Sequence, residues 1–183
     1  AGIDTKIVNL YIGGCSLATH WANVEADAAS YVYMLNGTAT DRRVSIREAL
    51  CEDTWDVITF QQASYDSGLA DSYFPYLSDL SAYVRQLAPQ AQQWMHQTWA
   101  YETGSTHPGF AAYGNDSDAM YAGIKAAYAQ AAESIGAPCI PCGTVIQTLR
   151  GLPLFDTANG GQSLCRDGFH MGWVYGRYAV AAT

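Results

Sequence analysis

The stretch Trp55-Asp-Val-Ile-Thr-Phe60 is typical of a buried strand, and Gln92-Gln-Trp-Met-His96 is a second apolar run of strand length. Between them, Pro75 opens a segment whose apolar residues recur at helical spacing as far as Leu87. Two parallel strands need a crossover connection, and a helix is the usual one. Strand, helix and strand in this order therefore predict a parallel sheet covered by helices on both faces.

The same alternation continues outward from this unit. Further strands are predicted at 6–12, 31–35 and 139–146, and further helices at 16–29, 45–51, 116–136 and 174–183. Asn36-Gly37 predicts a hairpin after the strand at 31–35. No internal repeat and no interdomain linker interrupts the pattern. The fold class that this pattern predicts is α/β, as one three-layer α/β/α domain.

Composition excludes several classes of protein. The 183 residues are 49% hydrophobic and carry 9 basic and 17 acidic side chains, a net charge of −8. This composition is not that of a disordered, collagen-like or coiled-coil chain. No apolar run is long enough to span a membrane. An acidic chain also repels phosphate backbones and anionic bilayers, so we expect no nucleic-acid partner, no membrane partner and no cofactor.

The spacing of the cysteines does not match a disulfide framework. They are odd in number and irregularly spaced: Cys15, Cys51, Cys139, Cys142 and Cys165. Buried free thiols are the favoured interpretation. A redox pair at Cys139 and Cys142, or a zinc site using Cys165 and His170, stays open as an alternative, although neither spacing is standard. We expect no metal. The thiols and the lack of a visible leader peptide lean towards a cytoplasmic location without deciding it.

Polar and aromatic residues gather where the predicted strands end, which is where parallel sheets bind ligands. Asp167-Gly-Phe-His170 is the sharpest element, because a carboxylate three residues before a histidine can accept the imidazole Nδ1–H and orient the ring as a base. Gly14 can offer an unhindered backbone N–H to an oxyanion, and Gln62 a side-chain N–H. Taken alone, the Asp-x-x-His spacing is equally compatible with a solvated loop.

Three sequence blocks in this order resemble the SGNH (GDSL-like) hydrolase superfamily, in a branch that carries all three: Ile12 to Leu17, Trp55 to Gln62, and Arg166 to His170. The similarity extends through 96–101 and 143–147. The resemblance implies a flavodoxin-like parallel sheet and a Ser–His–Asp site that attacks acyl esters. It makes His170 the general base and Asp167 its orienting group, with Gly14 and Gln62 in the oxyanion hole.

The nucleophile of that family is not found in this sequence. The family's serine lies after its first strand, in a Gly-Asn-Ser or Gly-Asp-Ser block, and no such block precedes Ile7. We therefore expect residues 1–183 to be a single domain truncated at both ends, without the family's first strand and helix, and inactive by itself. Ser16 and Ser64 are alternative nucleophiles. A helix cap for Ser16 and a loop anchor for Ser64 are the favoured interpretations.

Aromatic residues near the predicted cleft suggest how a substrate is held. His96, Trp99 and Tyr101 are expected to contact substrate, and Trp99, Tyr101 and Tyr113 could stack on a sugar ring or form an apolar lid. His107 is expected to be exposed to solvent. Two functions follow: an esterase that acts on small or carbohydrate-borne acyl esters, and a non-catalytic glycan-binding module that keeps the cleft.

Overall fold

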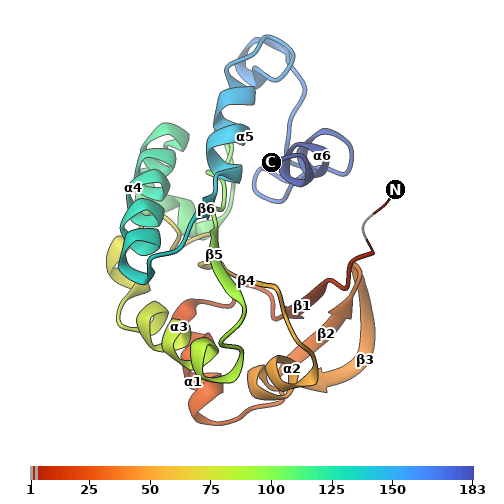
Figure 1. The fold of residues 1–183 in the computed structure, drawn as a ribbon. Coiled ribbons are helices and arrows are strands. Elements are labelled where there is room, and N and C mark those ends of the chain that lie inside the picture. Colours follow the sequence, from red (N-terminus) through yellow and green to blue (C-terminus); the bar gives the residue numbers. More distant parts are fainter. Residues whose placement is uncertain (1, 3) are drawn as a thin grey trace.

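The computed structural model describes Gly2 and residues 4–183 as two three-stranded sheets with helices around them (Figure 1). The parallel sheet has the order β4 (Val57–Phe60), β5 (Gln92–His96), β6 (Cys139–Ile140). The antiparallel sheet has the order β1 (Val8–Tyr11), β2 (Tyr31–Leu35), β3 (Thr38–Val44). The predicted α/β class with helices flanking a parallel sheet is confirmed.

Helices lie on both sides of the parallel sheet. They are α1 (Leu17–Glu25), α2 (Ile46–Glu52), α3 (Tyr76–Leu87), α4 (Ser117–Ile135), α5 (Cys142–Arg150) and α6 (Tyr175–Ala181). Short 3₁₀ helices are η1 (Ala70–Tyr73), η2 (Pro108–Tyr113) and η3 (Thr157–Asn159). Figure 1 shows α3 and α4 on one side of β4 and β5, and α6 on the opposite side. Among the described residues, no helix is both long and apolar enough to cross a bilayer.

The predicted helix starts and turns are confirmed by their hydrogen bonds. The hydroxyl of Ser16 accepts the backbone N–H of Thr19 at 3.2 Å, as a cap for α1 should. Asp116 caps α4 in the same way, and Gly136 ends that helix in the left-handed conformation. The turn at Asn36-Gly37 has φ angles of 48° and 82°, which match the geometry that joins two antiparallel strands.

Two details of the predicted sheet are wrong, and one pairing was not predicted. β1 pairs with the β2–β3 hairpin, and among the described residues it does not pair with the parallel strands. The strand predicted at 139–146 ends at Ile140, and α5 begins at Cys142, because Pro141 cannot donate to a sheet and is well suited to the start of a helix. β4 is not fully buried, since it forms one edge of the described parallel sheet and Val57 is 49% exposed.

Two separate cores support this architecture. The main core lies between α3, α4 and the sheets, and its largest fully buried members include Tyr31, Tyr73, Leu77, Met95, Met120, Ile124 and Tyr128. A smaller core joins α5 and α6 to the segment before His170 through Ile146, Leu164, Cys165, Met171 and Ala179. Helix α6 lies directly against the segment that contains Leu164. A Cβ added to Gly176 of α6 would overlap the carbonyl oxygen of Leu164. The second core therefore fixes the base of the predicted catalytic loop.

Candidate active site

Asp167 and His170 form the contact that their spacing predicts. The carboxylate Oδ2 of Asp167 lies 2.7 Å from Nδ1 of His170, and Oδ1 accepts the backbone N–H of His170 at 2.7 Å. Gly168 permits the turn between them with a φ of 84°. With Nδ1–H donated to the carboxylate, Nε2 of this exposed imidazole carries the lone pair, as a general base requires.

The electrostatics of Asp167 follow from these bonds. Partial desolvation raises its pKa, but the side chain of His170 and the backbone N–H groups of His170 and Phe169 lower it more strongly, to about 2. The carboxylate is therefore ionised throughout the neutral range. It can hold the imidazole in one tautomer and stabilise the imidazolium that forms when His170 takes a proton.

Trp99 holds this loop in place. Its indole Nε1–H donates to the carbonyl oxygen of Phe169 at 2.7 Å, and the ring is half-buried against the second core. The structure thus gives Trp99 a contact with the protein itself, in place of the open stacking face that the sequence suggested. The indole fixes the residue that directly precedes His170.

Glu102 is a second anchor, which the sequence analysis missed. Its backbone N–H donates to the carbonyl of Gly168 at 2.8 Å. Its carboxylate accepts the backbone N–H groups of Leu164 and Cys165 at 3.1 and 3.2 Å. The guanidinium of Arg150 lies 3.9 Å away, and both side chains are mostly buried. Glu102 therefore attaches the loop both before and within the Asp167–His170 turn.

The stacking platform expected of Tyr101 and Tyr113 does not form. Tyr101 is completely buried, with its hydroxyl 2.8 Å from that of Ser64, and burial raises its pKa to about 12. Tyr113 is also buried and donates its hydroxyl proton to the carbonyl of Tyr65 at 2.9 Å. Neither ring offers a face to a ligand in this structure. Ser64 anchors its loop through Tyr101, as the sequence suggested.

Of the two predicted oxyanion donors, only Gly14 is open. It is exposed with a φ of 64°, and its N–H has no hydrogen-bond partner among the described residues. Gln62 is almost fully buried: its Oε1 accepts the N–H of Leu17 at 2.9 Å, and its Nε2 donates to the carbonyl and the hydroxyl of Ser72, each at 3.0 Å. Both N–H bonds of the Gln62 amide are used, so this arrangement does not support Gln62 as an oxyanion donor.

The neighbouring Gln61 presents the free amide instead. Its Oε1 lies 2.6 Å from Nδ1 of His96, and among the described residues its Nε2 has no partner. The other ring nitrogen of His96 lies 3.4 Å from the thiol of the buried Cys142, and burial lowers the pKa of His96. His96, expected to contact substrate, is thus packed between Gln61 and Cys142, where it orients the exposed amide of Gln61.

His107 is not solvent-exposed as the sequence suggested. Its ring is half-buried, with its centroid 4.8 Å from that of Tyr101 and 4.8 Å from that of Phe169. Nδ1 accepts the N–H of Gly109 at 3.1 Å, so the neutral ring carries its proton on Nε2. The only feature of the sequence that could have indicated this contact is the position of His107, two residues before Gly109 in a glycine-containing loop.

Contacts around His107 connect the two separate parts of the site. Its ring stacks at 6.2 Å on Tyr65, whose hydroxyl donates to the carbonyl of Gly14 at 3.0 Å. On its other side it meets Phe169, the residue before His170. Gly14 and His170, which are far apart in the sequence, are therefore linked through two aromatic side chains and one imidazole.

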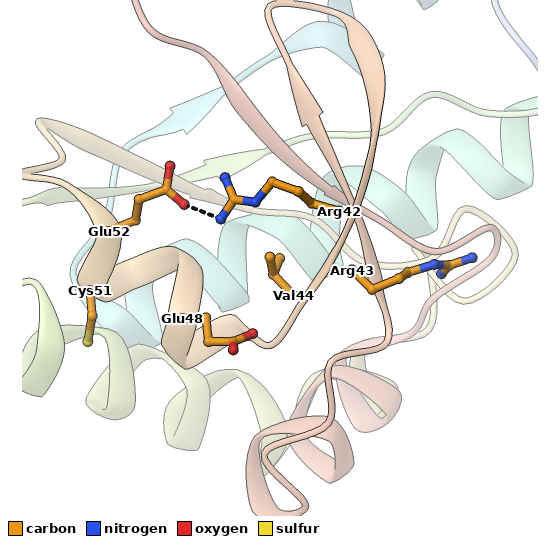
Figure 2. A pocket seen from close by; sticks show the side chains of 6 residues that line it. All are labelled: Arg42, Arg43, Val44, Glu48, Cys51 and Glu52. Carbon is orange, nitrogen blue, oxygen red and sulfur yellow. Dashed lines mark hydrogen bonds and ion pairs between the residues drawn. The ribbon is translucent and has the colours of Figure 1, made fainter.

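Two hollows of the described surface lie away from Asp167 and His170. One is shallow and lies between β3 and α2, lined by Arg42, Arg43, Val44, Glu48, Cys51 and Glu52 (Figure 2). The other, about 760 Å³, is lined by residues that include Glu102, Asp116, Asp118, Arg150 and Asp156. Neither is lined by Asp167 or His170. Within 2 and 4–183, no group of three or more His, Cys, Asp or Glu side chains is placed to hold a metal ion.

Comparison with known proteins gives a family and a fold. The profile of a domain of unknown function, DUF4886, matches residues 1–183. A DUF4886 family protein from Bacteroides uniformis has a crystal structure similar to this chain, with a TM-score of 0.87 and 38% identity. The match covers 96% of this chain and 68% of that one. Among curated proteins, no sequence matches this chain.

Two more distant structures share the fold. A protein from Slackia heliotrinireducens, proposed to be an SGNH hydrolase, is 22% identical with a TM-score of 0.61, over 92% of this chain and 77% of that one. A protein from Parabacteroides merdae, proposed to be a GDSL-like lipase, is 13% identical with a TM-score of 0.57, over 92% of this chain and 66% of that one. The chain therefore shares its α/β fold with these two proteins.

Proposed function

We propose that this chain, which belongs to the DUF4886 family, carries the general base and the oxyanion donors of a serine esterase of the SGNH type. The observation that carries the proposal is the Asp167–His170 pair, with 2.7 Å between Oδ2 and Nδ1 and with Nε2 open to solvent. The fold shared with two proteins proposed to be hydrolases of this superfamily supports it. The substrates are acyl esters, and carbohydrate-linked acetyl esters are the first class to test.

Each group has a defined part in the reaction. Nε2 of His170 takes the proton of the nucleophilic hydroxyl as its oxygen attacks the acyl carbon, and Asp167 stabilises the imidazolium. The N–H of Gly14 and the amide of Gln61 donate to the oxyanion. His170 then protonates the departing alcohol. Water attacks the acyl-enzyme with His170 again as base, which releases the acid and restores the hydroxyl.

We place the nucleophilic serine on a strand that precedes Ala1 and pairs with the outer edge of β4. This position rests on the resemblance to the superfamily and on the free edge of β4, which has no partner strand among the described residues and exposes Val57. The hydroxyl of Ser16 caps α1, and the hydroxyl of Ser64 is hydrogen-bonded to that of Tyr101. Both hydroxyls are therefore engaged, and we prefer the upstream serine as the nucleophile. The glycan-binding alternative loses its main support, because Tyr101 is buried and Trp99 is engaged by Phe169.

The test uses the longer protein that contains residues 1–183. We expect a fluorophosphonate to label one serine upstream of Ala1, located by peptide mapping, and acetyl or short acyl esters to be hydrolysed. His170→Ala should abolish labelling and turnover without lowering the thermal unfolding temperature, whereas Glu52→Gln, away from the site, should leave both unchanged. A well-folded protein with no label and no turnover would overturn the proposal. Label on Ser16 or Ser64 would keep the esterase but contradict the position of the nucleophile.

A further inference from the structure

We propose that Arg166, Trp173 and Arg177 form an anion-binding subsite beside His170, and that the preferred ester substrates carry a carboxylate or sulfate group. This inference rests on the proposed esterase function and names its substrate class. It takes the place of the uncharged sugar platform that Trp99 and Tyr101 were expected to form.

The subsite is built on one exposed indole. Trp173 is 67% exposed, and the guanidinium carbon of Arg177 lies 3.7 Å from its ring centroid. The guanidinium carbon of Arg166 lies 5.5 Å from the same ring. Cation–π attraction of this kind holds the two side chains in place. Two positive charges thus lie within 5.5 Å of the centre of one exposed indole ring.

The two guanidinium groups differ in their pairing within the protein. Nε of Arg166 lies 3.7 Å from Oδ2 of Asp167, an oxygen already bonded to His170. Among the described residues, the guanidinium of Arg177 has no carboxylate within ion-pair distance. Both guanidinium groups lie near the same exposed indole, so an anion that contacts both is attracted by two positive charges.

A second cluster of this chain shows cations that are paired with carboxylates. Arg42 and Lys6 are paired with the carboxylates of Glu52 and Asp53 at 2.7 to 3.3 Å. In a chain with a net charge of −8, most of the surface repels an anionic substrate. Arg166 and Arg177 place two guanidinium groups at one exposed indole of this acidic chain, and guanidinium geometry suits carboxylate and sulfate oxygens.

The position of the subsite relates it to the reaction. Arg166 directly precedes Asp167, and Oδ2 of Asp167 is shared between Arg166 and the imidazole of His170. An anion bound by Arg166 therefore lies beside the Asp167–His170 pair. The probes below accordingly separate the anionic group from the ester by one ring.

The experiment compares matched esters in the longer protein that contains this chain. The probes are 4-acetoxybenzoate, 4-acetoxybenzenesulfonate and the neutral 4-acetoxybenzamide, each corrected for its rate with hydroxide. We expect Arg177→Gln to lower kcat/KM about 10-fold for the anionic esters and to leave the neutral ester unchanged. Lys125→Gln, which removes an exposed cation from α4, should change none of them. The ratio between benzoate and sulfonate shows which anion is preferred.

A binding measurement separates this inference from the esterase proposal. We expect 4-acetamidobenzoate, which is not an ester, to quench tryptophan fluorescence and to bind about 10-fold more weakly to Arg177→Gln, with 4-acetamidobenzamide as the neutral control. If no ester is hydrolysed but this difference appears, the esterase proposal fails and the subsite stands. If Arg177→Gln affects charged and neutral probes alike, or affects none, the anion subsite is wrong.

Discussion

Two carboxylates of this chain, Asp167 and Glu52, have similarly lowered pKa values in different settings. The pKa of Asp167 is lowered to about 2 by the side chain of His170 and by backbone N–H groups, in spite of desolvation. The pKa of Glu52 is also lowered to about 2, first by Arg42 and then by Tyr33 and Lys6. Figure 2 shows Glu52 reaching from α2 towards Arg42 on β3.

The difference between them lies in the partner and not in the pKa. Arg42 and Lys6 keep their protons throughout the neutral range, because hydrogen bonds to carboxylates raise the pKa of each, so Glu52 belongs to a fixed ion-pair cluster. His170 can take up and release a proton, and Asp167 responds to that change. A shifted pKa therefore does not identify a catalytic carboxylate, whereas a titrating partner on an anchored loop is the more informative sign.

The largest expected effect comes from neutralising each carboxylate in turn. Asp167→Asn should lower kcat by about 10²- to 10⁴-fold, because the amide no longer holds the Nδ1–H tautomer of His170. Glu52→Gln should leave kcat within error of the unaltered protein. Steady-state hydrolysis of an acetyl ester measures both. Equal losses in the two variants would erase the distinction drawn between the clusters.

The pH dependence of that activity has a defined sign. Because the folded pKa of Asp167 is depressed, its interaction with His170 is complete above the ordinary range near 4 and is lost only as the pH falls through about 2. Loss of activity at mildly acidic pH should therefore not come from protonation of Asp167. Asp167→Asn should consequently lower the plateau of the pH–rate profile. It should not shift the position of the profile near pH 4.

A second histidine extends the comparison to stability. His20 is largely buried against Tyr31, with Nδ1 2.8 Å from its hydroxyl, and burial lowers its pKa to about 4. The unfolded chain binds a proton near pH 6.5 and the folded chain does not, so stability should fall as the pH drops from 6.5 to 4. The loss should be on the order of 2–3 kcal/mol, since one pKa unit corresponds to about 1.4 kcal/mol.

Chemical unfolding at a series of pH values measures this loss. His20→Gln should reduce the pH dependence between 6.5 and 4 and leave the part that comes from His96, whose pKa is also lowered by burial. An unchanged slope in His20→Gln would show that another group titrates in this range.

Two indole hydrogen bonds give a matched pair of smaller effects. Trp99 donates to the carbonyl of Phe169 at 2.7 Å beside the catalytic loop, and Trp55 donates to the carbonyl of Ala49 at 3.0 Å in α2. Each change to Phe should cost about 1 kcal/mol of stability. Only Trp99→Phe should also lower kcat, by about 10-fold, because it loosens the residue before His170. If Trp55→Phe lowers kcat as much, the effect is one of stability alone.

Much of the fold could be predicted because local signals agreed with the packing. Ser16 and Asp116 as caps, and Asn36-Gly37 as a turn, act within a few residues of their own position. The pairing of β1 with the hairpin could not be predicted this way. It depends on which distant strand is adjacent, and an apolar run of strand length fits either sheet.

The candidate site was predicted in part for the same reason. Asp167 and His170 are three residues apart, so their contact follows from a single turn. Gln61 and Gln62 are identical in kind, and only the tertiary structure shows that one amide is buried on Ser72 while the other is open. Glu102 binds a loop some sixty residues later, at Leu164, and no local pattern indicates this bond.

The smallest expected effect tests the ion-pair cluster itself. Glu52→Gln removes the carboxylate that Arg42 and Lys6 share, yet all three side chains are partly or largely open to water. Such pairs contribute about 0.2–1 kcal/mol each and are weakened by salt. Because the pKa of Glu52 is lowered, its contribution to folding stability is present above its ordinary range near 4.5 and is lost as the pH falls through about 2.

Urea unfolding at neutral pH tests this contribution. We expect Glu52→Gln to lose less than about 1 kcal/mol of stability, and this loss should shrink at 1 M NaCl. A larger loss that persists in high salt would mean that the cluster is a packing element of β3 and α2, and that only Asp167 is held mainly by electrostatics.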